Sequence, residues 1–534
     1  MKYNSVKRSL LSVGNLAIAA SLLLGSCTKH FESYNTDPYG LTNADLSIDY
    51  KLLGTPLQQA QMGIYSIVNP AWDFQVQQNL NADLYANYMA TPTPFDGGSN
   101  NSTYTMVSGW NSQAWADAYG FVMSQVKSVF TNGQAYPDFI AWARIIRVEA
   151  MHRVSDIYGP IIYTHYGSVN ADGSVTYDSQ KDAYYAFFND LDSAITVLTP
   201  LAQSGVKSGF TDFDYSYGGS YKEWVKFANT LRLRLALRIV NIDPAKAKTE
   251  GELALANPIG ILTDNTDNYN VSTGTQSHPL NVINNSWGDI RFGATLGSFL
   301  NGYKDARAPK YALPATDPTV AGQIIGVRTG INIDDKSRYE GYSQMVTFSN
   351  SIQLMTSAEA WFLKAEAALR GWAGAGNAGA NYNQGILTSF SQYGLDGSTY
   401  MNDATDLPQA YIDPKSIVAG ANNVTSAPEL STITIKWDGA APFAQQLERI
   451  ITQKYIAMYP EGQEAWSEYR RTGYPMLWPN VVNTSGGLIP SAKGIRRLPF
   501  SIDEVNSNPA GVAGAVTLLG GPDTGGTPLW WDVR

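Results

Sequence analysis

Helical periodicity with clear start and stop residues constrains the fold of this chain more than any other feature. Between residues 137 and 160, apolar side chains recur at helical spacing after a Pro-Asp start, and Gly159-Pro160 ends the pattern. Three further segments share this periodicity: residues 220–240, 356–372 and 445–475, the last reading as two helices joined near 460–462. These segments predict a mainly α-helical protein.

Two of the predicted helices begin with capping-box spacing, Ser220 with Glu223 and Thr356 with Glu359. The helices are alanine-rich, carry aromatic residues and come in pairs, which is typical of tetratricopeptide packing, although no clean 34-residue period repeats. We therefore expect tetratricopeptide-like helix pairs to form a scaffold for a loop-rich remainder with minor β structure.

Long stretches rich in Gly, Asn, Thr and Pro separate the predicted helices. They cover residues 90–111, 167–179, 262–288 and 396–442. Long irregular segments inside a compact protein are usually functional. Within the last stretch, "TITIKW" (residues 432–437) predicts a short strand. The sequence thus predicts a helical scaffold with one loop-rich face.

The only cysteine of the 534 residues, Cys27, follows a segment that has the features of an export signal. Three cations within the first eight residues precede an uncharged apolar run at 10–24, which is shorter than the about 20 residues of a membrane span. "LGSC" at 24–27 resembles the lipobox of bacterial lipoproteins, which predicts cleavage before Cys27 and lipid attachment to its thiol. The alternative is a leftover thiol in an ordinary secreted protein. We expect a signal peptide at 1–26 and a single unit at 27–534.

Charge and composition exclude several classes of partner. The net charge is −9, and removal of the three cations of the signal gives −9 − 3 = −12, which argues against binding to nucleic acid. The mature chain cannot form an internal disulfide, so its stability must come from a hydrophobic core. The 32 tyrosines and 13 tryptophans also suggest a recognition surface.

No familiar catalytic or metal-binding motif is present. The four histidines, His30, His152, His165 and His278, form no H-E-x-x-H motif, and no Cys-His cluster can exist. We interpret His152 as a histidine on a helix surface. The Asp/Asn-rich run at 263–270 lacks the spacing of a calcium loop, so structural calcium stays open and no other cofactor is expected.

One literal match to a nucleotide-binding motif is rejected. "GAGNAG", with Gly374, Gly376 and Gly379, fits G-x-G-x-x-G, but the dinucleotide fingerprint requires a preceding strand and a βαβ unit. Here a long alanine-rich helix precedes the glycines. The segment is predicted to be a loop between two helices.

Two loops carry the mixture of aromatic rings and amides that suits a sugar, whose ring has C–H groups on one face and hydroxyls at its edge. The first loop, residues 87–111, supplies the candidate ligand-binding residues Tyr88, Phe95, Asn100, Asn101, Tyr104 and Trp110. The second loop, residues 285–303, supplies Trp287, Arg291 and Tyr303. For each aromatic residue, packing in the core is the alternative interpretation.

Several segments together resemble one known family. They are "FESYNTDPYGLT" (31–42), "DLYANY" (83–88), "DIYGPIIY" (156–163), "EAWFLKAEAALRGW" (359–372), "EAWSEYRRTGYP" (464–475), "RRLPFSIDEVNSN" (496–508) and "LWWD" (529–532). With the lipobox, their order and spacing resemble the SusD/RagB family of outer-membrane nutrient-binding lipoproteins. The opening and the ending of the chain look closer to the SusD-like subgroup.

This resemblance implies the function. A SusD-like protein is lipid-anchored in the outer membrane, faces the cell surface, and lies over a TonB-dependent barrel transporter (SusC-like) to which it delivers nutrient. Most members bind glycans, some bind peptides, and none is expected to be an enzyme. A glycan is therefore the expected ligand, and oligopeptides are the alternative. A surface glycoside hydrolase is less favoured, but the separation of two acidic residues is not readable from sequence.

Overall fold

The computed structural model describes residues 48–67 and 71–534. The chain divides into two compact units, Met1–Leu52 and Leu53–Arg534. Only residues 48–52 of the first unit are described, and helix α4 (Lys51–Ile64) begins there. The fold and the site described below belong to the second unit.

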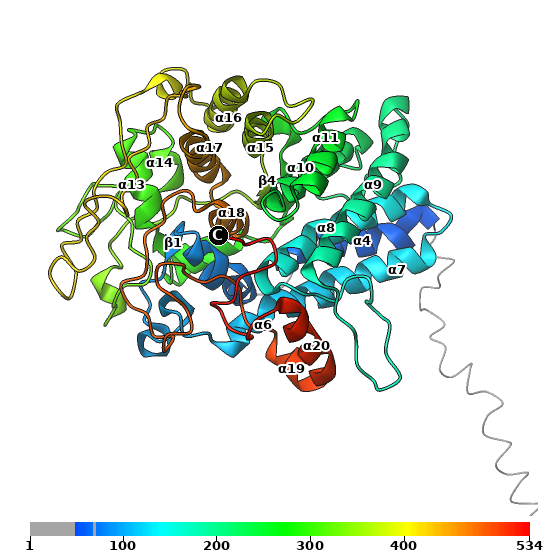
Figure 1. Ribbon diagram of the computed structural model, residues 1–534, viewed down its shortest axis with the longest axis horizontal. Coiled ribbons are helices and arrows are strands. Elements are labelled where there is room, and N and C mark those ends of the chain that lie inside the picture. The colour runs from blue at the N-terminus through cyan, green and yellow to red at the C-terminus, as the bar shows by residue number, and fades with distance from the viewer. Residues whose placement is uncertain (1–47, 68–70) are drawn as a thin grey trace, which may run out of the picture. The chain divides into compact units, whose positions relative to one another are not determined.

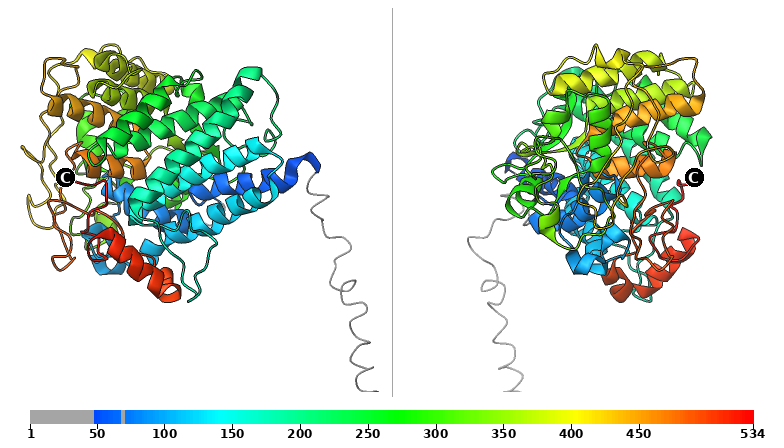
Figure 2. Two further views of the ribbon diagram at one scale, coloured as in Figure 1. Left: turned by 45° about the vertical axis from the view of Figure 1, so that its right-hand side comes forward. Right: turned by 90° about the vertical axis from the view of Figure 1, so that its left-hand side faces the viewer.

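Four consecutive helices form the first part of the scaffold. They are α8 (Pro137–Tyr158), α9 (Gln180–Ser204), α10 (Tyr221–Arg238) and α11 (Pro244–Ala256). Each packs against the next one along the chain, and the views in Figures 1 and 2 show them side by side in cyan to green. Helix α8 ends at Gly159, as its sequence predicts, because glycine there adopts a φ of 91° that other residues avoid.

A second group of helices packs on the first through α15. It comprises α15 (Ser357–Leu369), α16 (Ala378–Gln392), α17 (Phe443–Met458) and α18 (Gly462–Thr472). Helix α15 contacts α16, α17 and α10, so it joins the two groups. The glycine-rich segment that includes Gly374 connects α15 to α16, as predicted. The mainly helical fold class is confirmed.

The remaining helices have at most 11 residues and surround this scaffold. They are α5 (Ala71–Phe74), α6 (Ser108–Asp117), α7 (Ser124–Asn132), α12 (Pro279–Asn281), α13 (Ala294–Gly302), α14 (Ala308–Tyr311), α19 (Ile502–Ser507) and α20 (Pro509–Leu519). Three segments have π-helical hydrogen bonding: η2 (Gln75–Asp83), η5 (Ala118–Met123) and η7 (Val282–Ser286). Segment η2 packs against α5, α6 and α18.

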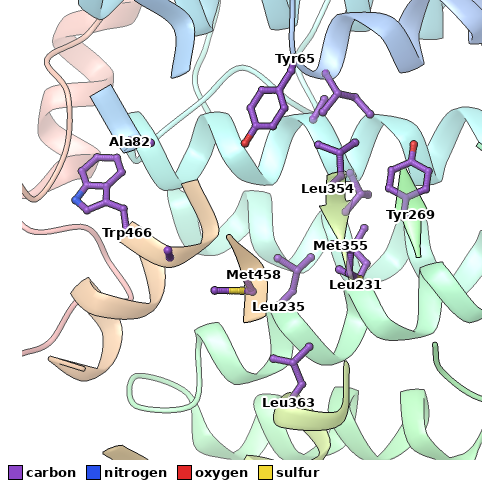
Figure 3. Packing of buried hydrophobic residues seen from close by; sticks show 14 of the residues in the cluster. Tyr65, Ala82, Leu231, Leu235, Tyr269, Leu354, Met355, Leu363, Met458 and Trp466 are labelled. Atoms are coloured by element: carbon purple, nitrogen blue, oxygen red, sulfur yellow. The ribbon is translucent and has the colours of Figure 1, made fainter. Parts of the chain in front are cut away.

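Apolar side chains from both helix groups meet in one core. Leu231 and Leu235 of α10 pack in the same cluster as Leu363 of α15 and Met458 of α17, and all four are at most 1% exposed (Figure 3). Burial of side chains of this size contributes roughly 1.5–3 kcal/mol each. A core of this kind provides the stability that disulfides cannot provide in this chain.

Four short strands make up the β structure of residues 48–67 and 71–534. They are β1 (Met89–Ala90), β2 (Tyr269–Ser272), β3 (Arg291–Phe292) and β4 (Ser351–Met355), and they form two antiparallel pairs, β1 with β3 and β2 with β4. The prediction of a strand at 432–437 is wrong, because these residues form no strand. Two backbone oxygens of this segment accept hydrogen bonds from tyrosine hydroxyls instead of from a neighbouring strand. Tyr303 Oη donates to Ile433 O at 2.8 Å, and Tyr382 Oη donates to Ile435 O at 2.5 Å. The apolar alternation of this segment therefore reflects burial, not strand pairing.

The two predicted capping boxes form only in part. Thr356 Oγ1 accepts a hydrogen bond from Glu359 N at 3.1 Å, but the carboxylate of Glu359 pairs with Arg234 instead of returning to the cap. At the start of α10 the hydroxyl of Ser220 donates to the Glu223 carboxylate and caps no backbone amide. Both helices begin as predicted, because the spacing marks helix starts even where the reciprocal bonds are absent.

Charged side chains form a buried cluster where α10, α15, α17 and α18 meet. Arg234 Nη2 lies 2.7 Å from Glu359 Oε2, Arg238 Nη1 lies 2.8 Å from Glu468 Oε1, and Lys454 Nζ lies 3.1 Å from Glu464 Oε1. All are nearly inaccessible to solvent. We call these six residues the buried ionic cluster. Removing one partner of a buried ion pair would lower the stability of the protein, because an unpaired buried charge costs several kcal/mol.

The interpretation of His152 as a surface residue is wrong. The imidazole is buried on α8, with Nε2 3.3 Å from Glu149 Oε2 and Nδ1 3.6 Å from Asp156 Oδ2. Its helix packs on both α9 and α10, so the face that carries His152 is an interior face. The residue is a partner of buried carboxylates and has no access to a ligand.

Candidate binding face

The two loops predicted from the sequence meet through the β1–β3 pair. Met89 is opposite Phe292 and Ala90 is opposite Arg291, and Gly293 N donates to Tyr88 O at 2.9 Å. A Cβ added at Gly293 would lie 2.8 Å from the carbonyl carbon and oxygen of Tyr88. Only glycine permits this approach of the two backbones. The pairing, whose four residues are buried, brings residues 87–111 and 285–303 together.

Asp289 connects the two loops through hydrogen bonds. Its Oδ1 accepts from Thr93 Oγ1 at 2.8 Å and from Lys336 Nζ at 3.0 Å, and its Oδ2 accepts from Gln75 Nε2 at 3.2 Å. Lys336 Nζ also donates to the backbone oxygen of Trp287 at 2.6 Å. Four segments distant in sequence are thereby held together, and the negative charge of Asp289 is balanced by Lys336.

The aromatic side chains of this region differ in their exposure to solvent. Trp287 is 37% exposed, and Trp72 is 53% exposed on α5, which packs against η7 immediately before Trp287. Phe95 and Trp110 are half-buried and meet edge to face, with ring centroids 5.5 Å apart at 89°. The exposed indoles of Trp72 and Trp287 can stack on a ligand ring. The rings of Phe95 and Trp110 pack against each other and are only partly available to a ligand.

A pocket of about 510 Å³ lies beside Thr93. It is lined by hydroxyls, amides, glycines and a few apolar side chains, among them Thr91, Thr93, Ser99, Asn100, Asn332 and Thr484. No ionisable side chain lines it. Such a lining offers hydrogen-bond donors and acceptors without charge. It suits a neutral polar ligand.

Most of the other candidate residues of the first loop lie in the interior. Tyr88 is fully buried and its hydroxyl donates to Tyr455 O. Asn101 Nδ2 donates to Asn111 Oδ1 at 2.9 Å, and Asn100 Oδ1 caps a short turn by accepting from Ser102 N at 2.9 Å. These polar groups hold the loop, and Asn100 also lines the pocket beside Thr93, where its contact with a ligand stays a prediction.

Tyr104 does not line the pocket beside Thr93. It is 7% exposed and lines a neighbouring hollow of about 430 Å³ with Tyr85 and Trp478, which shares Ser102 with that pocket. It adopts a φ of 73° at the end of the turn that Asn100 caps. The sequence alone could not distinguish it from Trp110, because both are aromatic residues of the same polar loop.

Two candidate residues of the second loop are structural as well. The guanidinium of Arg291 is buried and donates to Glu340 O at 2.9 Å and to Ile290 O at 2.7 Å, and burial lowers its pKa. Tyr303 is buried at the end of α13 with its hydroxyl on Ile433 O. Of the nine candidates, Phe95, Trp110 and Trp287 remain at the surface and Asn100 lines the pocket beside Thr93, and contact of these four with a ligand stays a prediction.

Sequence reasoning missed four residues of the face: Trp72, Gln75, Asp289 and Lys336. Trp72 lies in the short apolar run "AWDF", which has no loop signature, and Lys336 lies almost fifty residues beyond Trp287. Asp289 was within the second loop, but its role depends on partners from three other segments. No pattern in the sequence reports such long-range hydrogen bonds.

Other expectations concern anchoring and metal binding. Cys27 and the signal peptide at 1–26 lie outside the described residues. Across residues 48–67 and 71–534, no helix is both long and apolar enough to span a membrane. Within the same residues, no group of three His, Cys, Asp or Glu side chains is arranged to hold a metal ion. Structural calcium therefore remains an untested expectation.

Comparison with known proteins identifies the family. Residues 33–532 match the family model described as SusD-like, Susd and RagB outer membrane lipoprotein. The chain belongs to the SusD-like family. The resemblance inferred from sequence is thus confirmed, and the family description places its members in the outer membrane as lipoproteins.

Solved structures agree with this assignment. A chitin-binding SusD homolog from Flavobacterium johnsoniae is 42% identical with a TM-score of 0.86, covering 90% of this chain and 99% of that one. SusD homologs from Bacteroides vulgatus and Bacteroides thetaiotaomicron are 37% and 32% identical, with TM-scores of 0.85 and 0.84. They cover 91% and 90% of this chain and 99% of their own. No curated protein matched this SusD-like chain.

Proposed function

We propose that this SusD-like lipoprotein binds oligosaccharides on the face that carries Trp72 and Trp287. The observation that carries the proposal is the combination of two exposed indoles with an uncharged pocket of hydroxyls and amides, whose Thr93 bonds Asp289, two residues after Trp287. Indoles stack on the C–H face of a sugar ring, and hydroxyl and amide groups bond to its edge. Because Lys336 balances Asp289, the face favours neutral sugars.

Chitin fragments are the first ligand to examine. A homolog of 42% identity binds chitin, and oligomers of N-acetylglucosamine are neutral. Their acetamido groups both donate and accept hydrogen bonds, as the pocket beside Thr93 requires. This supports a glycan ligand over the oligopeptide alternative, whose charged termini would find no charged partner in that pocket.

The protein is proposed to act by binding alone. Both carboxylate oxygens of Asp289 accept hydrogen bonds from the protein, so this acid is engaged in structure. Anchored through Cys27, the protein would hold the sugar at the cell surface and deliver it to a TonB-dependent, SusC-like barrel. Neither a glycoside hydrolase activity nor a cofactor is needed for that role.

Titration calorimetry with chitohexaose, and separately with a mixture of neutral oligopeptides, tests this function. Trp287→Ala and Trp72→Ala should each weaken chitohexaose binding by roughly 5- to 150-fold, as exposed aromatic anchors do, with little change in thermal unfolding. Phe443→Ala serves as a matched control, because Phe443 is 46% exposed at the start of α17, outside the face.

Three results would count against the proposal. Chitohexaose affinity unchanged in both tryptophan variants would remove the ligand from this face. Binding of oligopeptides without binding of any glycan would replace the ligand class. Release of reducing ends from chitohexaose by the purified protein would show that it is an enzyme.

A further inference from the structure

A second hollow, of about 590 Å³, adjoins the pocket beside Thr93. Thr484 lines both of them. Most of the lining surface of the second hollow is apolar, and its apolar side chains are Met106, Leu488, Ile489 and Pro499. We call it the Leu488 hollow, because Leu488 is 63% exposed and open to contact. A ligand that occupies the pocket beside Thr93 can therefore continue past Thr484 into apolar surroundings.

Two threonines between the pocket and the hollow leave a hydrogen-bond acceptor at the surface. Thr484 Oγ1 donates its single proton to Thr103 O at 2.7 Å. In the 2.6 Å contact between Thr105 Oγ1 and Thr484 Oγ1 the donor must then be Thr105, because a hydroxyl carries one proton. Thr105 consequently has no proton left for a ligand, but its oxygen can still accept a hydrogen bond.

The charged side chain of the Leu488 hollow is an acceptor as well. Of the described residues that line the hollow, only Asp523 is charged. Its Oδ1 accepts from Phe500 N at 3.0 Å, and its charge is balanced by the guanidinium of Arg497. The carboxylate is 25% exposed, so it can accept a further hydrogen bond. A ligand group that suits this hollow therefore carries a hydrogen-bond donor next to an apolar surface.

We propose that the Leu488 hollow binds N-acetyl groups of the oligosaccharide and thereby selects N-acetylated chains over unsubstituted ones. An acetamido group has an N–H beside a methyl group. The methyl can pack on Leu488 and Met106 while the N–H donates to Thr105 Oγ1. A hydroxyl in its place supplies the donor but no apolar surface. A free amine would be cationic, and Arg497 already neutralises Asp523.

The inference rests on the proposed function, because Thr484 makes the Leu488 hollow an extension of the pocket beside Thr93. It adds a basis for selectivity that the pocket alone does not supply. The hydroxyls and amides of that pocket can bond to any neutral sugar, whereas the apolar side chains of the Leu488 hollow distinguish a sugar that carries methyl groups.

Calorimetry with chitohexaose and with cellohexaose, which has hydroxyls in place of the acetamido groups, tests this selectivity. The wild type should bind chitohexaose roughly 10-fold or more tightly than cellohexaose. Leu488→Ala removes apolar contact and Thr105→Val removes the acceptor at nearly constant volume. Each should reduce the preference roughly 3- to 10-fold and leave cellohexaose affinity unchanged.

Leu253→Ala and Thr249→Val are the matched controls. Both residues are exposed on α11 and line neither hollow, so both variants should keep the wild-type preference. Saturation-transfer NMR with chitohexaose gives a second readout. Saturation of the acetyl methyl protons should fall relative to that of the ring protons in Leu488→Ala, which a general loss of binding would not produce.

The outcomes separate this inference from the proposed function. Equal wild-type affinity for the two hexaoses, or an unchanged preference in both Leu488→Ala and Thr105→Val, would refute the N-acetyl site and leave the binding face intact. A preference that falls in these two variants, with chitohexaose affinity unchanged in Trp72→Ala and Trp287→Ala, would support the hollow and refute the face. Absence of any glycan binding would refute both.

Discussion

Replacing Gly293 by alanine should disturb the binding face at its base. The added Cβ would meet Tyr88 C and O at 2.8 Å and would come still closer to Asn87 O. Real Cβ contacts with backbone atoms are not found below 3.0 Å. All three atoms are backbone, so no flexible side chain can move away, and one strand must shift relative to the other.

The structure also limits how far the strands can shift. Gly293 N is bonded to Tyr88 O at 2.9 Å, and on the other side Ala294 N donates to Val327 O at 3.0 Å. Overpacking of this kind costs about 1–3 kcal/mol, and a lost ladder hydrogen bond adds roughly 0.5–1.5 kcal/mol. We expect Gly293→Ala to lower the free energy of unfolding by about 2–4 kcal/mol and to weaken chitohexaose binding.

Gly109→Ala is the matched control for this measurement. Gly109 lies in α6 next to Trp110, and a Cβ there would meet nothing within 4 Å. The same change should be neutral or stabilising by up to about 1 kcal/mol. Urea unfolding and calorimetry on both variants give the comparison. Equal stability of Gly293→Ala and wild type would refute the close approach of the two loops.

Three further predictions address anchoring, the core and pH dependence. Cys27→Ser should abolish lipidation, since the thiol is the only acyl acceptor in "LGSC"; incorporation of a clickable fatty acid into that variant would contradict this. Lys454→Met should reduce stability by about 3–5 kcal/mol, because it leaves the three carboxylates of the buried ionic cluster with only two cations, and an unchanged urea midpoint would disprove it. Burial and the nearby Asp73 raise the pKa of Asp117 to about 8. A raised carboxyl pKa gives stability that is present below the unfolded pKa of about 4 and is lost as pH rises to 8, so Asp117→Asn should flatten unfolding curves measured between pH 4 and 8.

The helices were predictable because their periodicity and punctuation are local. Gly159 ends α8 where the sequence predicts, and α15 begins after Thr356. The same local reasoning failed for residues 432–437, where an apolar alternation is produced by contacts with tyrosines from other segments. It also failed for His152, whose partners on its own helix were visible in the sequence but whose burial by neighbouring helices was not.

The binding face was predictable as two loops but not as a set of residues. Aromatic and amide content identified both loops. It did not show that Tyr88 and Tyr104 are buried whereas Trp110 and Trp287 are accessible to solvent. The two-residue strands that join the loops are too short to give a sequence signal. Trp72 comes from a helix outside both loops, so only the fold brings it near.

The buried ionic cluster has a consequence for helix alignment. Arg234 and Arg238 lie one turn apart on α10, while their carboxylate partners come from α15 and α18, and Lys454 comes from α17. Sliding any one of these helices by a single turn would move its charges by about 5.4 Å, beyond reach of their partners. At least one charge would then be stranded in the interior at a cost of several kcal/mol. Apolar residues alone tolerate such slippage more readily, so the ion pairs select one register. Insertions or deletions in surface loops alter none of these pairs and leave that register unchanged.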